Sequence, residues 1–165
     1  MTGLLVAGAA VVWAAMLPAA AYAAALPADR SAAQVFAFAV YAFGSAICHQ
    51  RDERSFHLFA EQLPVCARCT GLYAGAAIAA IWYVGLFRRR ASGPGPSGVE
   101  GPPSGAAGTG TARLLLASAA VPMAASLVYE WTTGDVPSNV VRAGTGIVFG
   151  SAVANVILAA VDSTR

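Results

Sequence analysis

The fold of this chain is decided by the stretch CHQRDERSFH at residues 48–57, which is followed by PVCARCTG at residues 64–71. Together these segments contain all three cysteines and both histidines of the protein. Apolar, alanine-rich runs flank them on both sides. This concentration of reactive side chains predicts a cysteine-centred site held between hydrophobic helices.

The composition is that of a membrane protein rather than a soluble one. Of the 165 residues, 58% are hydrophobic and only 11% are charged, with a mean hydropathy of +0.63. A soluble domain carries about 25% charged residues, and long uncharged segments are typical of membrane spans. The formal net charge of +2 gives no argument for nucleic acid. The lipid bilayer is therefore the partner that the sequence indicates, and no protein partner can be read from it.

Two apolar segments precede the cysteine stretch. Leu4–Ala25 is long enough to cross a hydrocarbon core of about 30 Å. The alternative is a signal peptide cleaved near Ala21-Tyr22-Ala23, but no basic residue precedes the run and its apolar region is too long. Ala32–Ile47 is short for a span, so we expect an interfacial helix that brings Cys48 to the membrane surface, with a full span as the alternative.

Three apolar runs follow the stretch: Thr70–Phe87, Leu114–Tyr129 and Ala143–Val161. Residues 91–112, between the first two, are mostly Gly, Pro, Ser and Ala and have little apolar surface to offset the entropy of ordering. We predict a disordered loop at 91–112 within a single membrane domain of residues 1–165. The predicted fold class is all-α, an integral membrane helical bundle of about four transmembrane helices plus one short interfacial helix.

Basic residues predict the orientation of the bundle. Arg88-Arg89-Arg90 and Arg113 mark their loop as cytoplasmic under the positive-inside rule. Counting spans from that loop places the cysteine stretch and the turn at residues 132–138 together on the extracytoplasmic face of the cell (inner) membrane.

Small residues recur at helical spacing in two of the runs. In a membrane such lines let two helices approach closely, although Gly and Ala are also simply common in this sequence. The candidate contact residues are Gly71, Gly75 and Ala79 in one run and Gly144, Gly146 and Gly150 in the other.

The cysteine spacing predicts a metal site. Cys66-x-x-Cys69 brings two sulfurs together across a turn, and the following helix N-terminus and Arg68 both favour the thiolate form. With Cys48 and His49 they make a Cys₃His set, which suits zinc or another thiophilic metal ion. Because adjacent residues chelate one ion awkwardly, His57 is the alternative fourth ligand.

The same atoms support a second hypothesis, a membrane thiol–disulfide redox protein. Cys66 and Cys69 would cycle between dithiol and disulfide, with Cys48 as a resolving or shuttle cysteine. A third interpretation treats the cysteines as small buried hydrophobes. The sequence predicts no specific reaction, so whether the protein is an enzyme stays open.

Polar residues at the helix ends are candidates for a shell around the ligands. Glu130 closes an apolar run, where an ionisable group needs a partner, and the partner is an arginine of the stretch or Arg142 across the turn. Topology places them at the same membrane surface as the cysteines. The predicted supporting residues are Arg51, Arg68, Glu130, Asn139 and Arg142.

The motifs resemble a known family. The pattern Cys48-His49-Gln50-Arg51-x-x-Arg54-Ser55-Phe56, then residues 62–71 (QLPVCARCTG), looks like the signature of small prokaryotic membrane proteins known as a domain of unknown function. Residues 138–146 (SNVVRAGTG) resemble the family's second motif, whereas residues 130–133 (EWTT) depart from the acidic–Gly pattern common there. The resemblance covers about Tyr41 to Gly150 and implies the membrane architecture and the importance of the motif, but no reaction.

Overall fold

The computed structural model describes residues 1–92 and 109–163, which are mostly helical. These residues form five α-helices. A short 3₁₀ turn and a two-stranded antiparallel hairpin lie between the second and the third helix. The helices are α1 (Thr2–Ala24), α2 (Ser31–Ile47), α3 (Ala67–Ser92), α4 (Thr109–Thr133) and α5 (Asn139–Ser163); the turn is η1 (Asp52–Arg54), and the strands are β1 (Ser55–Leu58) and β2 (Glu61–Cys66).

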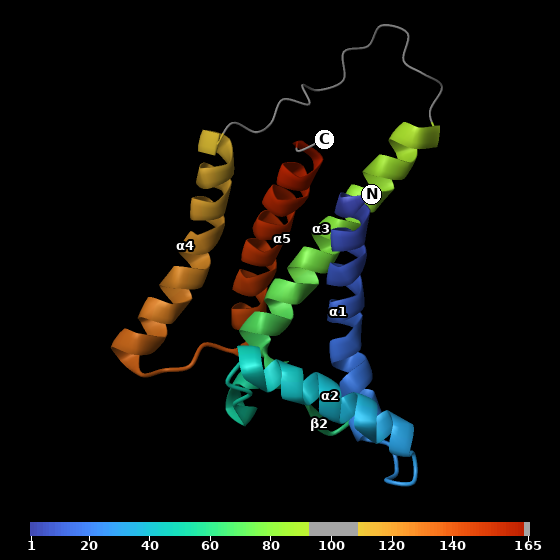
Figure 1. Cartoon of the computed structure of the whole chain (residues 1–165). Coiled ribbons are helices and arrows are strands. Elements are labelled where there is room, and N and C mark those ends of the chain that lie inside the picture. The colour runs from blue at the N-terminus through green and yellow to red at the C-terminus, as the bar shows by residue number, and fades with distance from the viewer. Residues whose placement is uncertain (93–108, 164–165) are drawn as a thin grey trace, which may run out of the picture.

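Helix α3 packs against both α1 and α5, and α4 packs against α5 (Figure 1). Trp13 of α1 meets Tyr73 of α3 edge to face, with ring centroids 5.8 Å apart. The Tyr83 hydroxyl of α3 donates to the Asp162 carboxylate of α5 at 2.9 Å. That contact lies at one end of the bundle, and the cysteine stretch lies at the other.

Glycines allow α3 and α5 to touch backbone to backbone. A Cβ atom added at Gly71 would collide with the backbone of Ala143, and one added at Gly150 would collide with the backbone of Leu72. Gly75 and Gly146 are equally close to the opposite helix, whereas a Cβ at Gly144 would meet open space. The predicted small-residue contact is therefore present, but Gly144 is not part of it.

Helix α2 lies across the end of the bundle where α1 ends, at a steep angle to α1, α3 and α5 (Figure 1). It has 17 residues and packs against α1 and β2. This placement delivers Cys48, the residue after its last turn, to the hairpin.

The hairpin corrects the all-α prediction. Ser55 pairs with Cys66 and Leu58 with Glu61, with an irregularity between Ser55 and His57. The turn residues Phe59 and Ala60 both have positive φ, 58° and 65°, as in the hairpin turns whose twist matches that of the strands. The segment between the two motifs is thus a strand pair rather than part of an all-helical fold.

Three helices of the described chain are long and apolar enough to cross a membrane: Thr2–Ala24, Gly110–Thr133 and Asn139–Asp162. Few residues in their apolar stretches are buried: 22% in α1 and in α5, and only 6% in α4. Large apolar side chains such as Leu5 and Trp131 are 72% and 78% exposed.

The predicted loop at 91–112 falls mainly on residues 93–108, which lie outside the described residues. Its ends belong to helices, because α3 extends to Ser92 and α4 begins at Thr109.

Candidate metal centre

The three cysteines converge from three different elements. Cys48 follows α2, Cys66 ends β2, and Cys69 lies in the first turn of α3. Their sulfur atoms all lie within 4.8 Å of one another, and none forms a disulfide. Cys48 is buried, and the other two are half-buried. Residues 18 positions apart in the chain are thus brought into one cluster by the hairpin.

Two glutamines of the motif hold the hairpin against α2. Gln50 has a positive φ of 44°, and its amide nitrogen donates to the carbonyls of Tyr41 and Pro64 at 2.8 and 2.6 Å. Gln62 donates to the Gln50 carbonyl at 2.7 Å and to the Ser55 hydroxyl at 3.1 Å. Sequence reasoning gave neither glutamine a role, although both belong to the quoted motif. They fix the position of Cys48 relative to Cys66.

Hydrogen bonds within the cluster favour a thiolate. The Cys66 backbone N–H donates to the Cys48 sulfur at 3.1 Å. The Cys69 thiol lowers the pKa of Cys66 to about 5 by hydrogen bonding, against the opposing effect of burial. Thiolate is the form that binds metal and the form that attacks disulfides.

The spacing of the sulfurs suits a thiophilic ion. Zinc binds thiolates at about 2.3 Å in a tetrahedron, which separates two sulfur ligands by about 3.8 Å. Sulfurs within 4.8 Å of one another reach that separation with small side-chain movements. The donor set therefore fits a zinc-type ion, with three ligands from the chain.

The two histidines lie outside this group of three. His49 is exposed and lines the same pocket as the cysteines. His57 lies on β1, where its Nε2 contacts the Asp52 carboxylate at 2.8 Å. Of the two candidates for a fourth ligand, His49 is thus the one beside the sulfurs.

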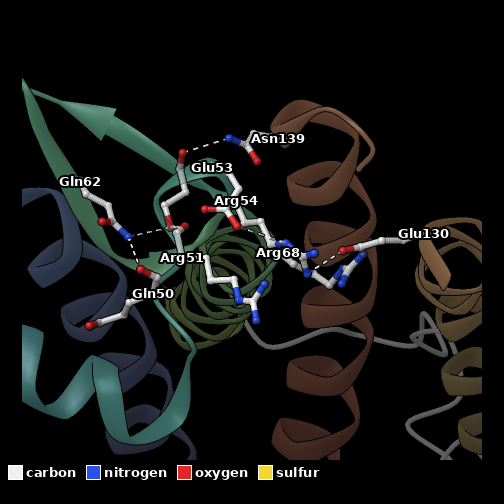
Figure 2. A network of polar contacts seen from close by, with 9 residues as sticks. Gln50, Arg51, Glu53, Arg54, Gln62, Arg68, Glu130 and Asn139 are labelled. Carbon is white, nitrogen blue, oxygen red and sulfur yellow. Dashed lines mark hydrogen bonds and ion pairs between the residues drawn. The ribbon is translucent and has the colours of Figure 1, made fainter. Parts of the chain in front are cut away.

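Glu130 is buried between arginines of the cysteine stretch. Its carboxylate lies 2.6 Å from the Arg54 guanidinium and 3.5 Å from that of Arg68 (Figure 2). Arg68 also donates to the Ser126 hydroxyl at 3.1 Å. Only 6% of the Glu130 side chain is exposed. These ion pairs join the end of α4 to η1 and α3, so the partners of Glu130 are arginines of the stretch rather than Arg142.

Two residues of the second motif reach the same region. Asn139 donates to the Ser55 carbonyl at 2.9 Å, which ties the start of α5 to β1. Arg142 is 2% exposed, and its Nε and Nη1 atoms have no hydrogen-bond partner. It lines a pocket together with the cysteine cluster and the exposed Arg51.

Two curated archaeal proteins are similar to parts of the chain. An uncharacterised protein of Methanocaldococcus jannaschii is 48% identical over 44 residues, which cover 27% of this chain and 28% of that protein. An uncharacterised protein of Methanothermobacter thermautotrophicus is 53% identical over 30 residues, 18% of this chain and 27% of its own length. The chain thus matches little more than a quarter of either relative, and no solved structure matches it significantly.

The family comparison reaches further along the chain than these relatives do. A family model described as "Predicted membrane protein (DUF2085)" matches residues 48–156, from the first cysteine to the middle of α5. This range holds the cysteine cluster, the buried Glu130 and the second motif. Because the match covers more than half of the sequence and agrees with the resemblance seen in the motifs, the chain belongs to this family of predicted membrane proteins.

Proposed function

We propose that this protein binds a thiophilic metal ion, zinc above all, at one surface of a membrane. The observation that carries the proposal is the convergence of three sulfur atoms within 4.8 Å from three separate elements. Three free cysteines that gather in this way beside arginines make a poor apolar core but a strong ligand set. Thiolates select zinc and related soft ions over magnesium or calcium.

Cys48, Cys66 and Cys69 are the proposed ligands, and His49 is the proposed fourth. His49 is exposed at the pocket beside the sulfurs, so its ring is free to turn toward an ion that they hold. His57 is instead paired with Asp52 on the hairpin. A polar shell orients these ligands, as outer partners do in other metal sites. Its proposed members are Arg51, Arg68, Glu130, Asn139 and Arg142.

Metal analysis of the detergent-purified protein tests the proposal. We expect one zinc-type ion per chain, and we expect the Cys66→Ser/Cys69→Ser variant to lose it because a single thiolate cannot hold it. His49→Ala should weaken binding, and His57→Ala is the matched control that should not. Metal-free unmodified protein with three titratable thiols would overturn the proposal. Equal metal binding by His49→Ala and His57→Ala would exclude His49 as a ligand and leave the three cysteines.

The proposed topology has four spans, with α3 as the fourth. Helix α3 contacts α1, and it contacts α5 along its length from Gly71 to Tyr83. It therefore lies alongside two helices that are long and apolar enough to cross a membrane. Helix α2 is the proposed interfacial helix. Arg88-Arg89-Arg90 then puts the cysteine cluster on the extracytoplasmic face of the cell membrane.

A second candidate function is thiol–disulfide exchange, favoured by the adjacent sulfurs of Cys66 and Cys69. The Cys66 thiolate would attack a disulfide of a partner and release one partner thiolate, which takes a proton. Cys69 would then attack the sulfur of Cys66 in the mixed disulfide and release the second partner thiol. The partner gains the two electrons that the Cys66–Cys69 pair loses.

The pH dependence of alkylation tests the thiolate on which both functions depend. Because the pKa of Cys66 is lowered to about 5, this residue is already a thiolate at neutral pH. In metal-free protein we expect its reaction with iodoacetamide to be nearly constant between about pH 6.5 and 8.5. An ordinary thiol would react about tenfold faster for each pH unit over most of this range. Peptide mapping by mass spectrometry measures the rate, and such a rise at Cys66 would contradict the assignment.

A further inference from the structure

The pocket beside the cysteine cluster is strongly basic. It has a volume of about 410 Å³, within the range of about 300–1,000 Å³ for small-molecule sites. None of the described residues that line it is acidic. Its polar wall carries four guanidinium groups, which belong to Arg51, Arg54, Arg68 and Arg142.

These positive charges exceed the negative charge that the chain supplies. Glu130 lies behind the pocket and is shared by Arg54 and Arg68, and Glu53 lies 4.0 Å from Arg54. Among the described residues, no carboxylate forms an ion pair with Arg51 or Arg142. Arg142 is 2% exposed, yet its Nε and Nη1 atoms lack any hydrogen-bond partner. Buried nitrogen atoms of a charged group that lack hydrogen bonds are costly, so a partner for Nε and Nη1 of Arg142 is expected inside the pocket.

The cysteines do not remove this excess. Three thiolates around a divalent ion carry together a single negative charge, which is less than the two positive charges of Arg51 and Arg142. The guanidinium fork matches the oxygens of phosphate and carboxylate groups, and it forms its strongest hydrogen bonds with them. The pocket is therefore suited to an oxyanion with several oxygens.

Part of the pocket lining is apolar. Leu72 of α3 and Met123 and Leu127 of α4 line it, and both helices belong to the bundle rather than to the hairpin. The volume leaves room for more than a bare oxyanion beside the arginines. A ligand that fills it has an anionic head and an apolar part.

We propose that this pocket binds a phosphate monoester, with the phosphate on Arg51 and Arg142 and the apolar part against Leu72, Met123 and Leu127. The phosphate belongs to a lipid headgroup or to a free small molecule, because both present the same phosphate group to the arginines. The site rests on the arginines and is independent of the proposed metal.

Binding measurements on protein purified in maltoside detergent and phosphate-free buffer test this site. The probes are inorganic phosphate and short-chain phosphatidic acid, titrated by calorimetry, with short-chain phosphatidylcholine as the reference lipid. Binding of phosphatidic acid at least about tenfold tighter than inorganic phosphate identifies a lipid source, and comparable binding identifies a free phosphate. Saturable binding of neither anion, or equal binding of phosphatidylcholine, overturns the proposal.

Arginine variants give the decisive comparison. Arg51→Gln and Arg142→Gln should each weaken phosphate binding by about tenfold to hundredfold, as expected for the loss of a charged hydrogen bond. Arg51 is exposed, so its variant is informative even if Arg142→Gln fails to fold. Arg113→Gln, an exposed arginine at the other end of α4, is the matched control. Affinity unchanged in Arg51→Gln, or reduced equally in the control, contradicts the site.

The two functions of this region separate in the same variants. Cys66→Ser/Cys69→Ser should lose the metal and keep phosphate affinity, and Arg51→Gln added to that variant should still weaken phosphate binding. Absence of metal from the unmodified protein would therefore remove the metal proposal alone. Phosphate affinity lost in the cysteine variant would contradict the independence of the anion site.

Discussion

Replacement of Glu130 by glutamine is expected to lower the free energy of unfolding by about 3–5 kcal/mol, the cost of removing one partner from a buried ion pair. The carboxylate is 6% exposed and contacts both Arg54 and Arg68. Glutamine keeps the shape but removes the buried charge between Arg54 and Arg68, and it leaves Arg68 without a carboxylate partner among the described residues. Unfolding by SDS in mixed micelles, followed by tryptophan fluorescence, measures the loss.

Asp135→Asn is the matched control for this variant. Asp135 is an exposed carboxylate of the turn between α4 and α5, only five residues from Glu130. We expect a change within about 0.5 kcal/mol, as for most surface substitutions. Similar small effects of both substitutions would show that the Glu130 cluster contributes little to stability.

Replacement of Gly150 by valine is expected to destabilise the bundle by about 3 kcal/mol, the upper part of the usual overpacking range. A Cβ at this position collides with the backbone of Leu72, and a backbone cannot turn aside as a side chain can. The helices α3 and α5 would have to separate, and this would also move Cys69 in the first turn of α3. The same SDS titration measures the effect.

Gly144→Val controls for the change of residue type on the same helix. A Cβ at Gly144 meets nothing within 4 Å, so the added methyl groups face open space. We expect a far smaller loss than for Gly150→Val. Equal losses in the two variants would mean that helix propensity, rather than the α3–α5 contact, sets the cost.

The helices were predictable because membrane burial imposes a simple rule on sequence. Runs of apolar residues long enough for a bilayer coincide with α1, α4 and α5 to within a few residues at most ends. The spacing of small residues predicted a close helix contact, and the structure contains it at Gly71, Gly75, Gly146 and Gly150 but not at Gly144. The apolar runs and the glycine spacing are both visible in the local sequence, so predicting the helices and their contact needs no knowledge of distant residues.

The hairpin was not predictable by the same reasoning. Two-residue turns with both φ values positive favour Asn-Gly or Asp-Gly, because other side chains are strained there. This turn uses Phe59 and Ala60, which carry no such signal. The irregularity between Ser55 and His57 also breaks the alternation of side chains along β1.

The gathering of the three cysteines was predictable, but the pairing of the charged residues around them was not. The cysteine spacing indicated a cluster, and the positions of Glu130 and Arg142 at helix ends indicated a shared surface. Which arginine meets Glu130 depends on how η1 and α3 face α4, and no local pattern encodes that. The roles of Gln50 and Gln62 depend in the same way on the hairpin.

X-ray absorption at the metal edge of the purified protein tests the central claim most directly, because it reports the atoms bound to the ion. The account predicts three sulfur neighbours at about 2.3 Å and one lighter neighbour at about 2.0–2.1 Å, from Cys48, Cys66, Cys69 and His49. A first shell of nitrogen and oxygen atoms alone, in protein that contains metal, would contradict it.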